Sequence, residues 1–152
     1  MLAITLYDTV LWLHIVAVIV AFGALFAYPV FFAVNASAPI TERTGLHRAQ
    51  IAFSKKVTGP VLGVVLLAGA YLASDRDYWS EVWVSVPLLI LFVVAGLGAT
   101  VLRRNEQALL DTATAGDDLA YAEALGKAKT WTLVILALVV VAVFFMTVKP
   151  FA

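Results

Sequence analysis

Four long stretches without a charged side chain constrain this sequence more than any other feature. They cover about residues 9–34, 57–74, 82–102 and 130–148. An α-helix rises about 1.5 Å per residue, so roughly 20 residues cross a hydrocarbon core of about 30 Å. An open strand is excluded, because each unpaired backbone group would cost several kcal/mol in lipid. The pattern predicts an all-α integral membrane four-helix bundle, with residues 1–152 forming a single membrane domain.

Composition supports a lipid environment for these helices. Hydrophobic residues make up 63% of the chain, charged residues make up 13%, and the mean hydropathy is +0.99. A soluble domain is about 45 to 50% apolar and 25% charged. A larger apolar share would expose large apolar patches to water, and such patches drive association. The net charge of zero gives no argument for binding nucleic acid, and the absence of cysteine excludes disulfides and thiolate metal sites. We therefore expect the lipid bilayer, and no nucleic acid, as a partner.

The basic residues orient the predicted bundle. Most of them lie in the first and third connections: Arg43, Arg48, Lys55, Lys56, Arg103, Arg104, Lys127 and Lys129. The opposite side holds only Arg76 and Lys149. Cytoplasmic connections carry the excess of Lys and Arg, so the N-terminus, the C-terminus and the short acidic loop should face outward, with the protein in the bacterial cytoplasmic (inner) membrane. Lys55, Lys56, Arg43 and Arg48 also suit anionic lipid headgroups.

The two basic connections differ in predicted structure. The first starts with turn residues, Asn-Ala-Ser-Ala-Pro, and is interpreted as a cytoplasmic loop that contains His47. The third is expected to be helical on both sides of a break at Gly116. Asp117 or Asp118 can cap the following helix, and Glu123 with Lys127 forms an i,i+4 pair. The last span should therefore begin as a helix exposed to water.

His14 is the main candidate for a functional side chain, because it is the ionisable residue well inside a span. Ionisable groups within a membrane are expensive to bury and are therefore functional candidates. On a helix His14 shares its face with Ala17, Ala21 and Ala24, and such small residues let a flat molecule or another helix come close. Three roles remain open: a packed neutral imidazole, a haem or metal ligand, and a group that handles protons.

A second ligand for His14 must come from elsewhere in the chain or from another subunit. The other histidine, His47, is expected on the opposite side of the membrane, whereas Met146 is expected in the same leaflet as His14. His and Met form a known axial pair for haem iron, although a Met among aromatic neighbours also serves as ordinary packing. His14 from two subunits is an equally open route.

Close helix packing is predicted around Gly59 and Gly63, which form a G-x-x-x-G pattern beside Pro60. The partner helix could belong to the same chain or to a second copy in a homodimer. The spans contain no phosphate-binding glycine loop, no H-E-x-x-H, no serine nucleophile motif and no carboxylate pair. Enzyme chemistry therefore finds little support.

Two short motifs carry a family resemblance. Leu13-His14 followed by Gly23-Ala24 and Phe26, together with Ala68-Gly69-Ala70-Tyr71-Leu72, resembles bacterial membrane proteins of the copper-resistance D type and HemJ-type protoporphyrinogen oxidases. An uncharacterised set of bacterial four-helix membrane proteins is similar as well. Ala21 replaces the tryptophan usual in these families, and the stretch from Trp83 to Pro87 lacks the HemJ-type lysine, so the uncharacterised set is the closer likeness.

The resemblance implies four spans and, by analogy with the HemJ type, a haem-binding role for His14. Two functional classes follow from the sequence as a whole. The first is a non-catalytic helical subunit or scaffold of a larger membrane assembly. The second is a haem- or copper-associated membrane protein that uses His14, with Met146 as the candidate second ligand.

Overall fold

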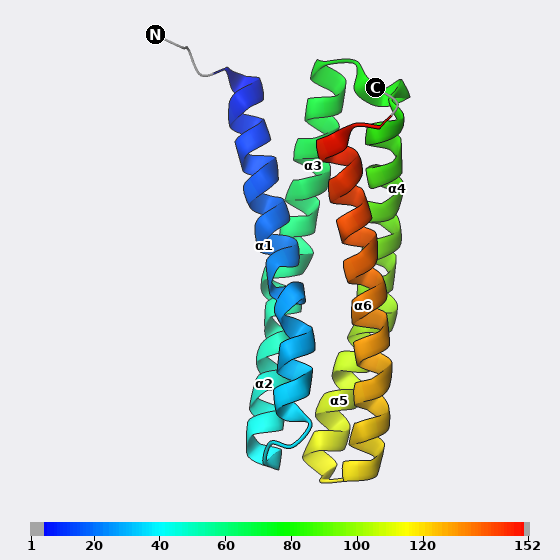
Figure 1. Ribbon diagram of the computed structural model, residues 1–152. Coiled ribbons are helices and arrows are strands. Elements are labelled where there is room, and N and C mark those ends of the chain that lie inside the picture. The colour runs from blue at the N-terminus through cyan, green and yellow to red at the C-terminus, as the bar shows by residue number, and fades with distance from the viewer. Residues whose placement is uncertain (1–4, 151–152) are drawn as a thin grey trace.

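The computed structural model describes residues 5–150, and this part of the chain forms helices and turns without a strand. Four long helices run up and down beside one another (Figure 1). The first is α1 (Leu6–Asn35) and the last is α6 (Asp118–Val148). The second joins α2 (Ile40–Phe53), the π-helical segment η1 (Ser54–Thr58) and α3 (Gly59–Asp75). The third joins α4 (Val82–Leu97), the π-helical segment η3 (Gly98–Leu102) and α5 (Arg103–Ala115).

Each of these four helices is long and apolar enough to cross a membrane, which confirms the predicted all-α four-helix architecture. A short 3₁₀ turn, η2 (Tyr78–Ser80), connects α3 to α4. The start of α1, the end of α6 and η2 lie at the same end of the bundle, here called the termini end (Figure 1). We call the opposite end, which contains α2, α5 and the first turns of α6, the basic end.

The helix boundaries follow from local capping chemistry. At the start of α1, Thr5 and Asp8 form a capping box in which each side chain accepts a hydrogen bond from the other residue's backbone N–H. The predicted break at Gly116 is confirmed, because this residue ends α5 with a φ of 71°, a conformation that favours glycine. The Asp117 side chain then caps α6 by accepting from the Ala120 N–H at 3.0 Å.

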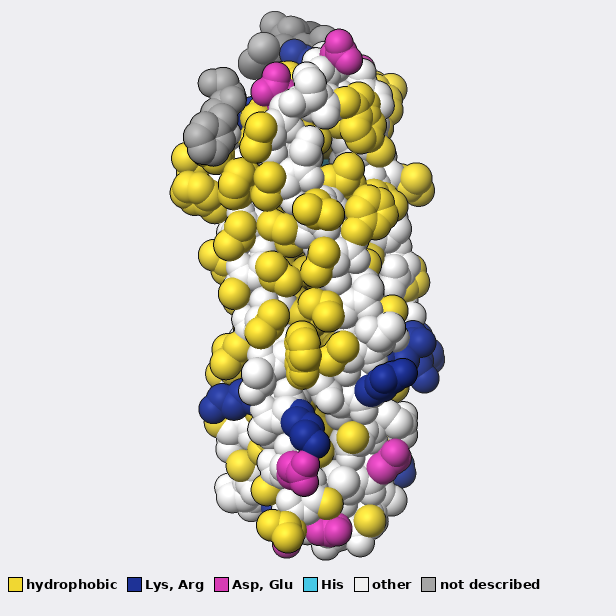
Figure 2. All heavy atoms as spheres, turned by 90° about the vertical axis from the view of Figure 1, so that its right-hand side faces the viewer, with side chains coloured by type: hydrophobic (Ala, Val, Ile, Leu, Met, Phe, Trp, Pro, Cys, Tyr) yellow, Lys and Arg dark blue, Asp and Glu magenta, His cyan; other side chains and the backbone are white. Residues whose placement is uncertain are grey.

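The surface of the bundle changes along its length. Figure 2 shows hydrophobic side chains covering the part nearer the termini end, down to a belt of Lys and Arg side chains. Large apolar residues point outward there, and Leu67 and Leu89 are 73% and 65% exposed. Beyond the belt, acidic side chains appear among the others (Figure 2). A basic belt next to an apolar band is the arrangement expected where a helical bundle emerges from lipid.

Buried residues hold the bundle together in two clusters. The larger contains Leu109, Tyr121, Ala128 and Ile135 and extends from the basic end toward the middle, where α6 packs against α4 and α5. The smaller joins α1 to α3 through Ala17, Ala21 and Val65. Both clusters use small residues at helix contacts, which lets the backbones approach closely.

The first basic connection differs from its prediction. The turn at its start is present, but residues 40–53 form α2 rather than a loop. His47 is 1% exposed within this helix, and its Nδ1 and Nε2 atoms lie 2.8 Å from Gln50 Oε1 and 3.0 Å from Tyr121 Oη. The sequence interpretation was wrong because a polar segment was equated with a solvated one, whereas α2 buries its polar face against α5 and α6.

Arg43 also has a different role from the predicted one at lipid headgroups. Its guanidinium donates to Asp118 Oδ1 at 2.6 Å and to the Ala36 carbonyl oxygen at 3.2 Å. The same group lies 4.6 Å from the centre of the Tyr121 ring. Arg43 therefore ties α2 to α6 at the basic end. The predicted pair of Glu123 and Lys127 is confirmed at 2.6 Å on the exposed face of α6.

Candidate functional site

His14 lies on the buried face of α1 and is only 7% exposed. Its Nδ1 atom is 3.1 Å from the Val65 carbonyl oxygen of α3. A carbonyl oxygen only accepts hydrogen bonds, so Nδ1 carries the proton and donates it. In the neutral ring, Nε2 then keeps its lone pair. Nε2 makes no hydrogen bond within residues 5–150, so it is the atom of His14 that is free to bind a ligand.

Gly69 of α3 creates the space in which the imidazole ring lies. A Cβ atom added at Gly69 would be 3.1 Å from His14 Cε1 and 3.5 Å from Nδ1. Ala17 and Ala21 pack against Val65 one and two turns further along α1. The small-residue face of α1 is therefore filled by another helix, which was one of the two predicted alternatives.

The close contact predicted at Gly59 and Gly63 is not found within the chain. A Cβ atom at Gly63 would meet nothing within 4 Å, and one at Gly59 would meet only the Ser54 carbonyl oxygen of the preceding turn, at 3.5 Å. Both glycines face outward. Of the two predicted alternatives, packing within the same chain is wrong, and contact with another chain stays a prediction.

His14 and Met146 line the same cavity, which we call the His14 cavity. It has a volume of about 90 Å³ and lies among α1, α3, α4 and α6, with walls that are almost entirely apolar. Val65 and Gly69 form its wall beside His14, and Met146 contributes from α6. The sequence prediction that these two residues share one level of the bundle agrees with this arrangement.

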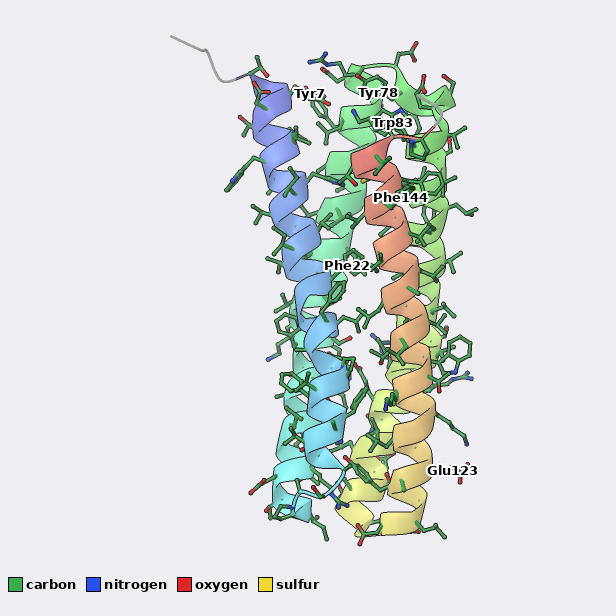
Figure 3. The ribbon with its side chains drawn as sticks, viewed as in Figure 1. Tyr7, Phe22, Tyr78, Trp83, Glu123 and Phe144 are labelled. Carbon is green, nitrogen blue, oxygen red and sulfur yellow. The ribbon has the colours of Figure 1, made fainter. Side chains whose placement is uncertain are left out.

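Aromatic and basic side chains close the termini end of the bundle. Tyr78 and Trp83 form an edge-to-face pair with ring centres 5.0 Å apart (Figure 3). The Lys149 ammonium lies 4.4 Å from the centre of the Trp83 ring, and Arg76 lies 4.5 Å from that of Tyr7. These cation–π contacts place Arg76 and Lys149 against aromatic rings of the termini end. They join the end of α3 to the start of α1, and the end of α6 to the start of α4.

The His14 cavity is small compared with the sites that hold large ligands such as haem. Sites for drug-sized ligands usually measure roughly 300 to 1,000 Å³, and this cavity is about 90 Å³. The small residues Ala17 and Ala21 of α1, against which a macrocycle could lie, are covered by Val65 of α3. Among the described residues no group of three or more His, Cys, Asp or Glu side chains is placed to hold a metal. The available donors are therefore one imidazole nitrogen and one thioether sulfur.

A second cavity, which we call the Glu106 cavity, lies nearer the basic end. Its volume is about 280 Å³, and residues of α1, η1, α3, α4, η3, α5 and α6 form its walls. Glu106 is 4% exposed, and its buried Oε1 atom has no hydrogen-bond partner within the described part of the chain. Phe22 and Val94 line both cavities and so separate them, and Figure 3 shows the Phe22 side chain between the helices.

The sequence did not identify Glu106 as a site residue, because Glu106 lies in the charged connection that follows the third span. A helical signal was present in the sequence, since Leu102, Glu106, Leu109 and Ala113 share one face of a helix at spacings of four, three and four residues. All four are buried. A carboxylate on the apolar stripe of an amphipathic helix is the pattern that would have identified it.

Comparisons with known proteins add no identity to these sites. No family model, no curated protein and no solved structure matches this chain. Function must therefore be inferred from the two cavities and the side chains that line them.

Proposed function

We propose that this protein is a non-catalytic integral membrane protein that holds a copper(I) ion in the His14 cavity. One observation supports the proposal above all others: the Nδ1–H of His14 donates to the Val65 carbonyl oxygen, which leaves the Nε2 lone pair free in a cavity shared with Met146. In known metal sites, a ligating histidine almost always donates its other ring N–H to a carbonyl or carboxylate oxygen in this way.

The donor chemistry favours a soft ion. Thioether sulfur selects copper(I) among biological metals, and imidazole is a suitable partner for copper. The walls of the cavity are apolar, so they offer a hard, strongly hydrated cation no oxygen ligands in place of its water. When bound, copper would supply a soft cation held by His14 Nε2 and Met146 Sδ. The role of the chain is to hold that ion in a dry, fixed place.

The same proposal includes the position of the chain in the bacterial inner membrane. The excess of Lys and Arg in the two basic connections, which include Lys55, Arg103 and Lys129, supports a cytoplasmic basic end and would put the His14 cavity in the outer leaflet. The cavity would then be reached from the periplasmic side or from lipid. A protein with this arrangement can bind, store or present copper at the outer half of the membrane.

Copper(I) titration of the purified protein tests this function. Wild-type protein should bind the ion stoichiometrically under reducing conditions, and His14→Ala should abolish binding while the helical circular dichroism is retained. Met146→Leu, which preserves side-chain volume, should weaken binding. His47→Gln is the matched control, because His47 lies at the basic end and should not affect copper. Wild-type protein without bound copper, or equal binding by His14→Ala, would exclude the proposed role.

A second candidate role, as a subunit of a membrane assembly, is favoured by the exposed face of α3. A Cβ atom at Gly63 on this face would meet nothing within 4 Å, and Leu67, one turn further along, is 73% exposed. A groove of small residues in lipid lets another helix approach closely. Gly63→Leu should therefore reduce the size of the purified assembly, whereas Val64→Leu should not. Equal sizes for wild type and both variants would argue against this interface.

A further inference from the structure

The Glu106 cavity combines a buried carboxyl group with an apolar chamber. Glu106 and Arg103 line it from α5, and Ser54 and Thr58 line it from η1. Deeper in the bundle its walls are formed by apolar residues: Ala21, Phe22, Leu25, Leu62, Val94 and Ile135. The polar lining thus lies on the side of the basic end, and the apolar lining lies toward the middle of the bundle.

Two π-helical segments border the Glu106 cavity. η1 contributes Ser54 and Thr58 to the cavity, and η3 contributes Gly98, Ala99 and Leu102. A π-helical turn contains an extra residue and occurs mostly as a short bulge, frequently at functional sites. Here both bulges line one chamber from neighbouring long helices. Small residues, among them Ala21, Gly59 and Ala95, also line the chamber.

The carboxyl group lacks the partner that burial usually requires. Oε1 of Glu106 is inaccessible and without a hydrogen bond within residues 5–150. Burial raises the pKa of Glu106 to about 7, against the opposing effect of the Arg103 and Lys55 charges. The other polar or charged groups that face the cavity are Tyr28, Ser54 and Thr58. Because Oε1 itself is inaccessible, a cation in the cavity would reach the carboxyl group at its other oxygen.

From this geometry we infer that the Glu106 cavity binds an amphiphilic amine, with its ammonium group at Glu106 and its apolar tail along Phe22, Leu62 and Val94. The chamber volume of about 280 Å³ fits a headgroup and the first part of a chain. An ammonium is a strong donor to a carboxylate, whereas a carboxylate or phosphate alone offers Glu106 no donor. This site is independent of copper binding in the His14 cavity.

Two classes of molecule carry an ammonium group on an apolar tail: phosphatidylethanolamine, in its headgroup, and single-chain alkylamines. In both cases the ammonium would lie at Glu106, within one helical turn of Arg103 on α5. Arg103, on the wall of the same cavity, could in addition contact the phosphate of the lipid. Both molecules would be recognised through the ammonium group, and only phosphatidylethanolamine also carries a phosphate.

Binding of octylamine, octanol and octanoate to the purified protein tests the inference by thermal stabilisation and native mass spectrometry. Octylamine should bind saturably, and the other two, with the same tail, should not. Glu106→Gln, which keeps the shape of the side chain, should weaken octylamine binding by about tenfold or more. The matched control Glu123→Gln removes an exposed carboxylate on α6 and should have no effect.

A second variant separates binding from folding defects. Ala95→Leu adds bulk on the wall of the cavity without touching the carboxyl group, and it should also weaken octylamine binding. Equal binding of octylamine and octanol, or unchanged octylamine binding by Glu106→Gln, would overturn the inference.

Nanodiscs made of phosphatidylethanolamine or phosphatidylcholine then identify the source. Retention of phosphatidylethanolamine by wild type and its loss in Glu106→Gln would assign the site to lipid. Octylamine binding without lipid retention would assign it to a single-chain amine.

Discussion

Replacing Gly69 with alanine is expected to destabilise the protein relative to the same change at Gly63. The new Cβ atom at position 69 would lie 3.1 Å from His14 Cε1, which is closer than an ordinary van der Waals contact of about 3.5 to 4.0 Å. The imidazole cannot move away freely, because its Nδ1–H is bonded to the Val65 carbonyl oxygen at 3.1 Å. Relief of the contact must therefore stretch this hydrogen bond or separate α1 from α3.

The expected size of the effect follows from two opposing terms. Glycine to alanine within a helix stabilises by up to about 1 kcal/mol, and this gain applies to both positions. Overpacking a well-filled site costs about 1 to 3 kcal/mol, and this loss applies only to Gly69, since the space at Gly63 is open within 4 Å. Gly69→Ala should therefore be about 1 to 3 kcal/mol less stable than Gly63→Ala.

Unfolding by sodium dodecyl sulfate in mixed micelles, followed by tryptophan fluorescence, measures this difference. Both glycines lie in α3, so the propensity gain and the effect of the denatured state largely cancel between the two variants. Copper(I) binding is a second readout, which should weaken in Gly69→Ala and remain unchanged in Gly63→Ala. Equal stability of the two variants would refute the close packing of His14 on Gly69.

Four further predictions follow from the structure. Asp117→Ala should destabilise the protein by about 0.5 to 2 kcal/mol in the same unfolding assay, because α6 loses its N-cap. Burial lowers the pKa of His47 below its ordinary value of 6.5. As the pH falls below 6.5, the free energy of unfolding should therefore decrease by up to about 1.4 kcal/mol per pH unit. His47→Gln should remove this part of the pH dependence. The absorption spectrum of the purified protein should show no haem band, since the His14 cavity is small compared with the sites that hold large ligands. Single cysteines should be labelled from outside at Ser80→Cys, and at Thr114→Cys only after permeabilisation; the reverse pattern would invert the proposed orientation.

Much of the architecture could be predicted from sequence, because lipid imposes a simple rule. A charge-free stretch of about 20 residues must form a helix, and capping residues such as Asp117 mark where helices begin. The sequence also put His14 and Met146 at one level of the bundle, since each depth is set by distance from a helix end. The positions of the helices and the level of His14 and Met146 thus follow from the sequence and the thickness of a bilayer.

The contacts of individual residues depend on which helices pack against each other. Sequence periodicity does not determine the packing partners of a helix. Gly69 and the pair Gly59 and Gly63 are all glycines of α3, yet only at Gly69 would an added Cβ atom meet a side chain of α1. His47 and Arg43 read as solvated residues because their partners, Tyr121 and Asp118, lie about 75 residues away in sequence. The Glu106 cavity likewise requires two π-helical bulges to meet, and no local pattern predicted either of them.

X-ray absorption spectroscopy of the copper-loaded protein tests the proposed function most directly. Our account predicts a copper(I) edge with both a nitrogen and a sulfur neighbour. The sulfur contribution should vanish in Met146→Leu, and the imidazole scattering should vanish in His14→Ala. A spectrum with only oxygen or nitrogen neighbours, unchanged by either substitution, would contradict the assignment of copper to the His14 cavity.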